Sequence, residues 1–104
     1  MTRKKKSTFK QRLGKCYRLA GLYVLDHPKT TLVHGTINGF RYTKKDFDNS
    51  HAWVEENEHV FDPVWDRRLP IQVYYQMFCA VVHKKYTCEQ LRNLILKTGK
   101  WGAW

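Results

Sequence analysis

The sequence predicts one α+β domain, in which helices pack on a small antiparallel sheet. Three observations support this fold class. The chain has 104 residues, which is the size of a single domain. Stretches with apolar residues at helical spacing alternate with short runs rich in β-branched and aromatic residues. Apolar residues make up 42% of the chain and aromatic residues 14%, a globular composition without an apolar run that could cross a membrane.

A basic arm over residues 1–13 precedes the expected domain, which covers residues 14–104. The first 18 residues carry eight Lys or Arg and no acid, so most of the net charge of +10 belongs to this end. Such an arm suits a nucleic-acid backbone or an acidic partner, although a frayed, solubilising terminus explains the same composition. The cations concerned are Arg3, Lys4, Lys5 and Lys6.

A helix is expected to begin at Cys16, after one or two helical turns that end near Gly14. Its apolar side chains recur at the spacing of one helix face. They are Leu19, Ala20, Tyr23 and Val24. Pro28 ends the helix. Cys16 therefore lies in the first helical turn.

Three strands are expected next, at residues 30–37, 51–55 and 59–62. The first is rich in β-branched residues and is closed by the turn pair Asn38-Gly39. A polar loop over residues 40–50 follows it. The other two strands are separated by a short polar turn, and Pro63 stops the second of them. These two strands predict a hairpin.

The C-terminal part predicts a further strand and a helix. The run over residues 71–83 fits either one continuous strand or a helical turn followed by a strand, and a strand over residues 77–83 is favoured. Thr87 and Gln90 form a capping-box pattern before an apolar stripe, and Gly99 follows the last periodic residue. The chain therefore closes with a short helix and a Trp-rich tail.

The predicted hairpin places His51 and Asp62 on one face of the sheet. With a turn centred on residues 56–57, the two residues lie directly opposite each other; with a turn at residues 57–58, Asp62 faces Trp53 and is diagonal to His51. In both cases the carboxylate can accept a proton from one imidazole nitrogen and raise the basicity of the other. This arrangement is the base and orienting part of a nucleophilic triad.

Cys16 is the candidate nucleophile of this triad. Lys15 precedes it and Arg18 follows it, and the expected helix begins at this point. A helix N-terminus and nearby cations favour the thiolate over the thiol, and the thiolate is the reactive species. Cys16, His51 and Asp62 are therefore the predicted catalytic residues.

The stretches "GKCYRLAGLYVL", "TTLVHGTI", "HAWVE" and "VFDPVWD" carry a resemblance to a known family. In their order they resemble the transglutaminase-like core of the papain-like fold, in which a cysteine on a helix precedes a histidine and an aspartate on neighbouring strands. The sequence is also similar to the small leader peptidases that mature lasso peptides. The resemblance covers residues 14–66 and implies a nucleophile-bearing helix packed on a small antiparallel sheet.

This resemblance implies acyl transfer at an amide, with hydrolysis of a peptide or protein favoured over crosslinking. Cys16 would attack the carbonyl, His51 would act as general base and acid, and Asp62 would orient the imidazole. The backbone N–H of Cys16 and the side chain of Gln11 are candidate oxyanion donors, and Trp53 is a candidate wall of the cleft. No cofactor is implied. Only 15 residues precede the cysteine, so a partner protein that completes the cleft fits the sequence.

Two other functions fit the residues. One is a catalytically inactive transglutaminase-like protein that binds or inhibits another protein. The other is a basic nucleic-acid-binding module formed by the N-terminal arm and four further residues. These are Arg67, Arg68, Tyr74 and Tyr75.

The remaining composition bears on metals and on the compartment. Cys79, His83 and Cys88 have a C-x3-H-x4-C spacing, which lacks a paired-cysteine knuckle and a fourth ligand, so no metal site is expected. The N-terminus shows no apolar segment of a secretory signal, and three widely spaced cysteines do not form a disulfide framework. The cytoplasm is the expected location.

Overall fold

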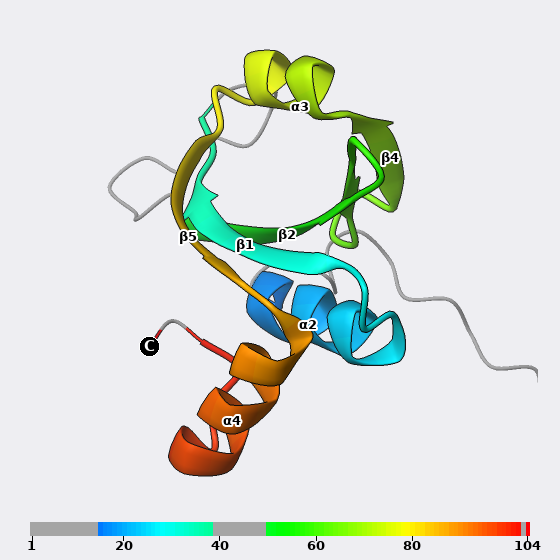
Figure 1. Cartoon of the computed structure of the whole chain (residues 1–104). Helices are drawn as coiled ribbons and strands as arrows, with labels where there is room; N and C mark the ends of the chain where they lie inside the picture. Colours follow the sequence, from blue (N-terminus) through cyan, green and yellow to red (C-terminus); the bar gives the residue numbers. More distant parts are fainter. Residues whose placement is uncertain (1–14, 39–49, 103) are drawn as a thin grey trace, which may run out of the picture.

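The computed structural model describes residues 15–38, 50–102 and 104. In this part of the chain, three helices accompany a five-stranded antiparallel sheet, which confirms the α+β class (Figure 1). The elements are α2 (Cys16–Asp26), β1 (Thr31–Thr36), β2 (Ser50–Glu56), β3 (His59–Asp62), β4 (Arg67–Pro70), α3 (Ile71–Met77), β5 (Val81–Tyr86) and α4 (Cys88–Thr98). No described helix has the length and apolar character that a membrane span requires.

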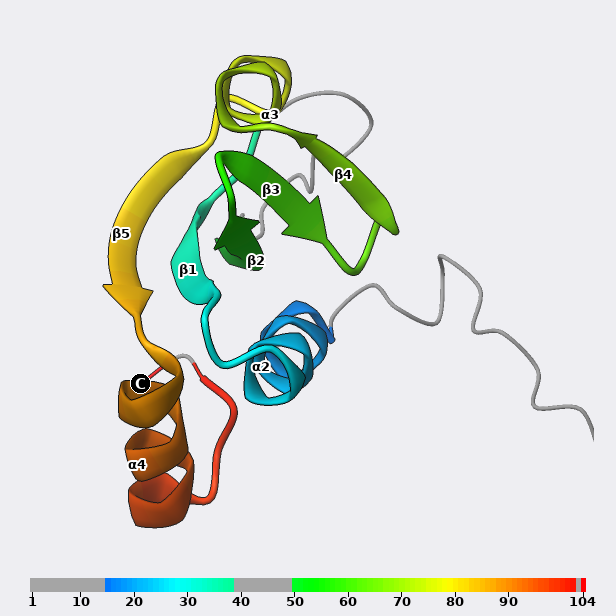
Figure 2. The same cartoon turned by 45° about the vertical axis from the view of Figure 1, so that its right-hand side comes forward.

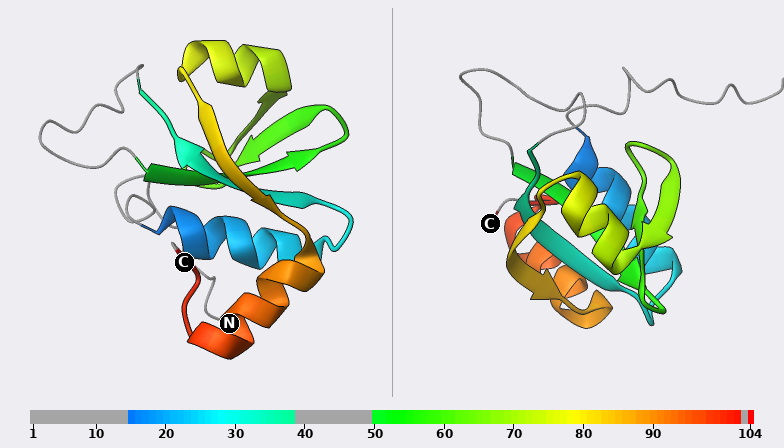
Figure 3. Two further views of the ribbon diagram at one scale, coloured as in Figure 1. Left: turned by 60° about the vertical axis from the view of Figure 1, so that its left-hand side comes forward. Right: turned by 90° about the horizontal axis from the view of Figure 1, so that it is seen from above.

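The sheet has the strand order β4-β3-β2-β1-β5 and is strongly curved (Figure 2). Helices cover both of its faces. Figure 3 shows α2 and α4 on one side of the strands and α3 on the other. Successive side chains of β2 point to opposite faces, so this strand contributes to two separate cores.

The core on the α2 side includes Ala52 and Val54 of β2, packed with Cys16 and Ala20 of α2. The core on the α3 side includes Trp53 of β2, packed with Tyr74 and Phe78. His51 has the same strand parity as Trp53, and its ring stacks with the indole at a centroid distance of 6.3 Å. The imidazole is therefore buried on the face that α3 covers.

The β2–β3 hairpin adopts the second of the two expected registers. Its turn is Asn57-Glu58, and the pairs that follow are Glu56 with His59, Glu55 with Val60, and Val54 with Phe61. Both turn residues have positive φ, 52° and 64°, as a two-residue turn that matches the strand twist requires. Continued by one residue, this register sets Asp62 opposite Trp53 and diagonal to His51.

Most of the expected elements are confirmed. The first helix begins at Cys16, the hairpin strands lie where they were expected, and Pro63 follows β3 directly. At α4, Thr87 accepts a hydrogen bond from the Gln90 backbone, the Gln90 side chain accepts one in return, and Gly99 adopts the left-handed conformation. This helix therefore has both caps that its sequence indicates.

The strand expected over residues 77–83 is present, but it begins four residues later than expected and extends to Tyr86. Residues up to Met77 belong to α3, and the strand β5 begins only at Val81. Pro70 directly precedes the helix, and Tyr74 and Phe78, four residues apart, are both buried against the sheet. Cys79, expected within the strand, instead lies between the two elements with a φ of 47°. Tertiary packing of one helical face decides between the two readings of this run.

Strand β4 was not expected, because its sequence RRLP lacks an alternating apolar pattern and most of its residues are exposed. It is held by its pairing with β3. The basic arm, the turn residue Gly39 and nearly all of the polar loop expected at 40–50 lie outside the described residues.

Replacing Glu58 with glycine should stabilise the fold. The left-handed backbone conformation costs a residue with a Cβ about 1–2 kcal/mol of conformational energy, whereas glycine adopts it without this cost. We therefore expect Glu58→Gly to raise the free energy of unfolding by about 1 kcal/mol in a urea titration. Glu58→Ala removes the same carboxylate but keeps the Cβ, so it should give no such gain. Equal stabilisation by both substitutions would contradict the explanation from backbone strain.

Candidate active site

Cys16 occupies the first position of α2. Lys15 is the residue before the helix, and the first turn, all of it described, contains no acidic residue. The backbone N–H groups of a first turn lack partners within the helix and carry its positive dipole end. The Cys16 side chain is 5% exposed and belongs to the core on the α2 side. The thiol is therefore buried at the positive end of a helix.

His51 and Asp62 form a buried hydrogen-bonded pair. The distance between Nε2 of His51 and Oδ2 of Asp62 is 2.8 Å, and both residues are fully buried. The pair lies beyond Val54 and Phe61, the last paired residues of the hairpin. Because Asp62 engages Nε2, it is the second ring nitrogen, Nδ1, that can serve the thiol.

Asp62 accepts hydrogen bonds at both carboxylate oxygens. The Tyr74 hydroxyl donates to Oδ2 at 2.6 Å, and the backbone N–H of Val64 donates to Oδ1 at 3.0 Å. Burial and the negative charge of Asp62 both raise the pKa of the Tyr74 hydroxyl, so it remains a donor. These hydrogen bonds replace those that the buried carboxylate loses with water, and they fix its orientation toward His51.

The pKa of His51 is shifted by its two neighbours, Asp62 and Cys16. Burial lowers this pKa, but the hydrogen bond and charge of Asp62, together with a hydrogen bond and charge from Cys16, outweigh burial and raise it to about 9. The contact with Asp62 is a hydrogen bond of 2.8 Å, and Cys16 lies close enough to His51 to raise the pKa of its imidazole. A protonated imidazole between a carboxylate and a sulfur favours the thiolate form of that sulfur.

His34 is a second buried histidine, and its pKa shifts in the opposite direction from that of His51. It is buried on β1 among the rings of Tyr17, Tyr86 and Trp104. Burial alone lowers its pKa to about 4, so it is neutral at physiological pH. Two buried histidines on adjacent strands therefore have opposite charge states, and the neighbouring Asp62 and Cys16 make the difference.

Trp53 lies beside the candidate site, although its ring is fully buried. It packs against Tyr74 and Tyr75 of α3 at centroid distances of 5.5 and 5.9 Å. Through these contacts Trp53 packs α3 against β2, the strand that also carries His51. Gln11, the other expected cleft residue, lies outside the described residues, as do the arm residues Arg3, Lys4, Lys5 and Lys6.

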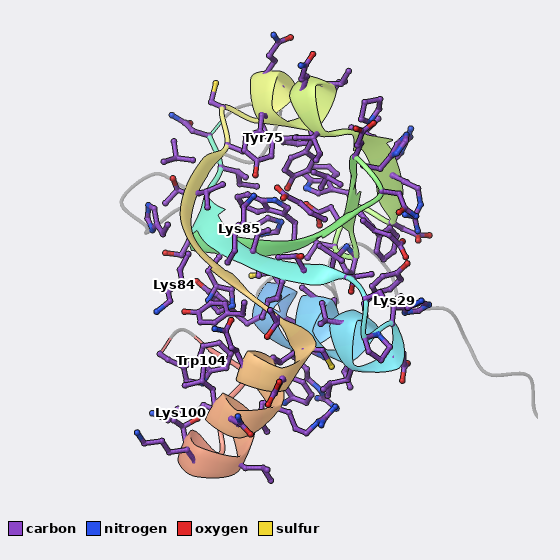
Figure 4. The ribbon with its side chains drawn as sticks, viewed as in Figure 1. Lys29, Tyr75, Lys84, Lys85, Lys100 and Trp104 are labelled. Atoms are coloured by element: carbon purple, nitrogen blue, oxygen red, sulfur yellow. The ribbon has the colours of Figure 1, made fainter. Side chains whose placement is uncertain are left out.

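The structure corrects the aromatic part of the expected nucleic-acid footprint. Tyr74 is 1% exposed and is bonded to Asp62, so its ring is not available for base stacking. Tyr75 extends from α3 toward the sheet and donates a hydrogen bond to Glu55, to which Lys85 is also paired (Figure 4). Arg68 is paired with Glu56. These four expected contact residues therefore do not form one exposed basic and aromatic surface.

Two residues of the site were not found from the sequence. Tyr74 was not linked to Asp62 because its segment, before the strand favoured at residues 77–83, was left open between a helical turn and a strand. Gly35 lies opposite His51 on β1, and a Cβ at this position would meet the Val81 carbonyl oxygen at 2.0 Å and the Trp53 ring at 2.8 Å. A glycine within a strand can indicate such a close approach. Gly35 therefore allows β5 and the Trp53 ring to approach β1 closely at the position opposite His51.

Among the described residues, no group of three or more His, Cys, Asp or Glu side chains is placed to hold a metal ion. Cys79 is exposed in the turn after α3, whereas Cys88 is buried at the start of α4. Comparisons with protein-family models, curated proteins and solved structures give no match for this chain. The candidate site is therefore identified only from the contacts within this chain.

Removing the Tyr74 hydroxyl should destabilise the protein. Tyr74→Phe keeps the ring but leaves the buried Asp62 carboxylate with one donor fewer, a loss of roughly 1.5–3 kcal/mol for a bond to a charged group. Tyr75→Phe is the matched control, because its hydroxyl donates to the partly exposed Glu55 and should cost less than about 1 kcal/mol. Urea unfolding of both variants measures the difference, and equal losses would contradict the role given to Tyr74.

Stability should also depend on pH through His51. Its pKa rises from 6.5 to about 9 in the folded protein, so protonated His51 stabilises the fold. This contribution is fully present below about pH 6.5 and is lost as the pH rises through about 9. We expect the difference in unfolding free energy between the native protein and His51→Gln to shrink over this interval. A difference that is constant from pH 6 to 10 would show that His51 is not protonated in the fold.

Proposed function

We propose that this protein is a cysteine-dependent hydrolase that acts on an amide bond of a peptide or protein. Cys16 is the nucleophile, His51 the general base and acid, and Asp62 the residue that orients the imidazole. The observation that carries the proposal is the state of His51, which is held by Asp62 at 2.8 Å and has its pKa raised by both Asp62 and Cys16. A thiol, an imidazole and a carboxylate in this relation form a nucleophilic triad.

The chemistry proceeds in two steps. The Cys16 thiolate attacks the amide carbonyl, and the C–N bond breaks as protonated His51 gives its proton to the leaving amine. Water then attacks the thioester, with His51 taking its proton, and the carboxylic acid and the thiolate are released. The backbone N–H of Cys16, at the start of α2, is a candidate donor to the oxyanion. Asp62 stays bonded to Nε2 of His51, so the ring keeps its orientation.

The papain-like, transglutaminase-like fold is part of this proposal. The order of elements supports it: the helix with the cysteine comes first, then β1, then β2 with the histidine and β3 with the aspartate. The helix packs on one face of an antiparallel sheet, as the resemblance implies. A peptide or protein is the preferred substrate class because it follows from the same resemblance. The role left for a partner protein is to complete the cleft around these residues.

A second candidate function is a catalytically inactive member of this fold that binds another protein. The burial of Cys16 favours it, because a side chain that is 5% exposed is reached by a substrate only where the surrounding chain leaves access. Many buried cysteines are small apolar side chains without chemistry. The two functions differ in the reactivity of one sulfur atom, which can be measured directly.

Alkylation by iodoacetamide between pH 6 and 9, followed by peptide mass spectrometry, separates the two functions. In the native protein, Cys16 should react faster than Cys79 at pH 6.5, because the proposed role of His51 is to activate the neighbouring sulfur. Cys79 is exposed and serves as the reference thiol in the same sample. In His51→Ala, labelling of Cys16 at pH 6.5 should fall about tenfold or more, while labelling of Cys79 should not change.

Two controls make the result interpretable. Circular dichroism of His51→Ala shows whether the variant keeps the native fold, and His51→Gln provides a larger polar replacement if it does not. Cys16 labelling that is slower than that of Cys79 and is indifferent to His51 would refute the hydrolase and support the inactive binding protein. Hydrolysis itself is then tested on peptide libraries, with Cys16→Ser as the inactive reference.

A further inference from the structure

A cavity of about 380 Å³ lies beside the candidate site, between α3 and the β3–β4 hairpin. Strand β4 leads directly into α3, and Figure 2 shows the helix beside the ends of β3 and β4. Arg67 and Leu69 alternate with Arg68 on β4, so both face the cavity. The lining residues are Asp62, Trp65, Arg67, Leu69, Tyr74, Met77 and Phe78. The volume is at the lower end of the range for small-molecule sites.

Most of the lining is apolar. Trp65, Tyr74 and Phe78 form a continuous group of rings, with centroid distances of 5.6 Å between Trp65 and Phe78 and 4.8 Å between Tyr74 and Phe78. Leu69 adds a branched aliphatic side chain, and Met77, which is 44% exposed, adds a flexible one. Such a wall suits an aliphatic chain, and a methionine can adapt to its length.

The two oxygen-bearing side chains on the inner wall, Asp62 and Tyr74, already make hydrogen bonds. Oδ2 of Asp62 accepts from His51 and Tyr74, and Oδ1 accepts from the Val64 backbone. The Tyr74 hydroxyl donates its one O–H hydrogen bond to Asp62. Neither group has a further proton to donate to a ligand, so the inner part of the cavity favours an apolar chain over a ligand rich in hydrogen-bond acceptors.

Arg67 is the exception in this lining. It is exposed, and within the residues that the structure describes its guanidinium makes no ion pair or side-chain hydrogen bond. The adjacent Arg68 points to the other face, where it pairs with Glu56 at 2.8 Å and donates to the Tyr23 hydroxyl. The cavity therefore combines an apolar interior with one uncompensated positive charge.

We propose that this cavity binds a medium-chain acyl carboxylate, with the alkyl chain against the aromatic rings and the carboxylate on Arg67. A guanidinium binds a carboxylate through two parallel hydrogen bonds, which an alcohol or an amine cannot reproduce. A peptide end would bring the same carboxylate, but its amide groups would lie against a wall made mostly of aromatic and aliphatic side chains. An alkyl chain has no such groups, so it fits the interior without an unsatisfied hydrogen bond. The cavity shares Asp62 and Tyr74 with the candidate active site, but binding of the carboxylate does not require the Cys16 sulfur.

Calorimetric titration of the full chain with octanoate, 1-octanol, octylamine and acetate tests this ligand class. Octanoate should bind about tenfold more tightly than octanol, because only the carboxylate pairs with Arg67. Octylamine should bind most weakly of the three alkyl compounds, and acetate should not bind measurably. Lengthening hexanoate to octanoate should strengthen binding about tenfold, the effect of burying two CH₂ groups.

Three variants locate the site. Arg67→Gln should abolish the preference for octanoate over octanol. Arg68→Gln removes the same charge from the neighbouring residue on the opposite face and should leave octanoate binding unchanged. Leu69→Trp fills the cavity and should abolish binding of every alkyl ligand. If Leu69→Trp does not fold, the comparison of Arg67→Gln with Arg68→Gln still decides the question.

Four results would overturn the proposal: no octanoate binding up to millimolar concentration, equal binding of octanoate and octanol, equal effects of the two arginine substitutions, or tighter binding of N-acetyl-leucine than of octanoate. The last would assign the cavity to a peptide end instead. All four can be obtained with Cys16→Ser, so failure of this inference and failure of the proposed hydrolase are distinguishable.

Discussion

The buried carboxylate of Asp62 is the constraint on which the site depends. A charge without access to water must be matched by hydrogen-bond donors, or the fold loses several kcal/mol. Asp62 takes these donors from three places: His51 on β2, Tyr74 on α3 and the backbone after β3. Each donor is useful only if its element is correctly placed. One carboxylate therefore links the hairpin, the turn after it and the covering helix.

The same constraint explains the backbone features around the site. The Asn57-Glu58 turn keeps two residues in the left-handed region, and this turn sets the register that brings Asp62 diagonal to His51. Gly35 has no side chain where β5 and Trp53 come closest, so the His51 strand stays tightly packed. Local backbone strain is tolerated here because burial and hydrogen bonding elsewhere compensate for it.

The sequence predicted the parts of the fold that depend on local patterns. These include the helix start at Cys16, the hairpin and both caps of α4. Alternation showed that His51 and Asp62 share a face, but the register stayed open because it depends on which turn conformation forms. Tyr74 was missed for a different reason. Its segment fits a helix or a strand, and only packing of Tyr74 and Phe78 against the sheet selects the helix. Strand β4 has no apolar pattern, so its pairing with β3 could not be read from its residues.

The position of Tyr74 in the chain has a consequence for biosynthesis. It lies on α3, whereas Cys16, His51 and Asp62 are all translated earlier. A nascent chain that has not yet released α3 from the ribosome lacks the hydroxyl that completes the carboxylate's hydrogen bonds. Under the proposed chemistry, such a nascent chain would hold an unassembled thiol and imidazole, and reactivity would emerge only once the later helix docks. The hydrogen bonds of the buried carboxylate are thus completed only after α3 has been synthesised.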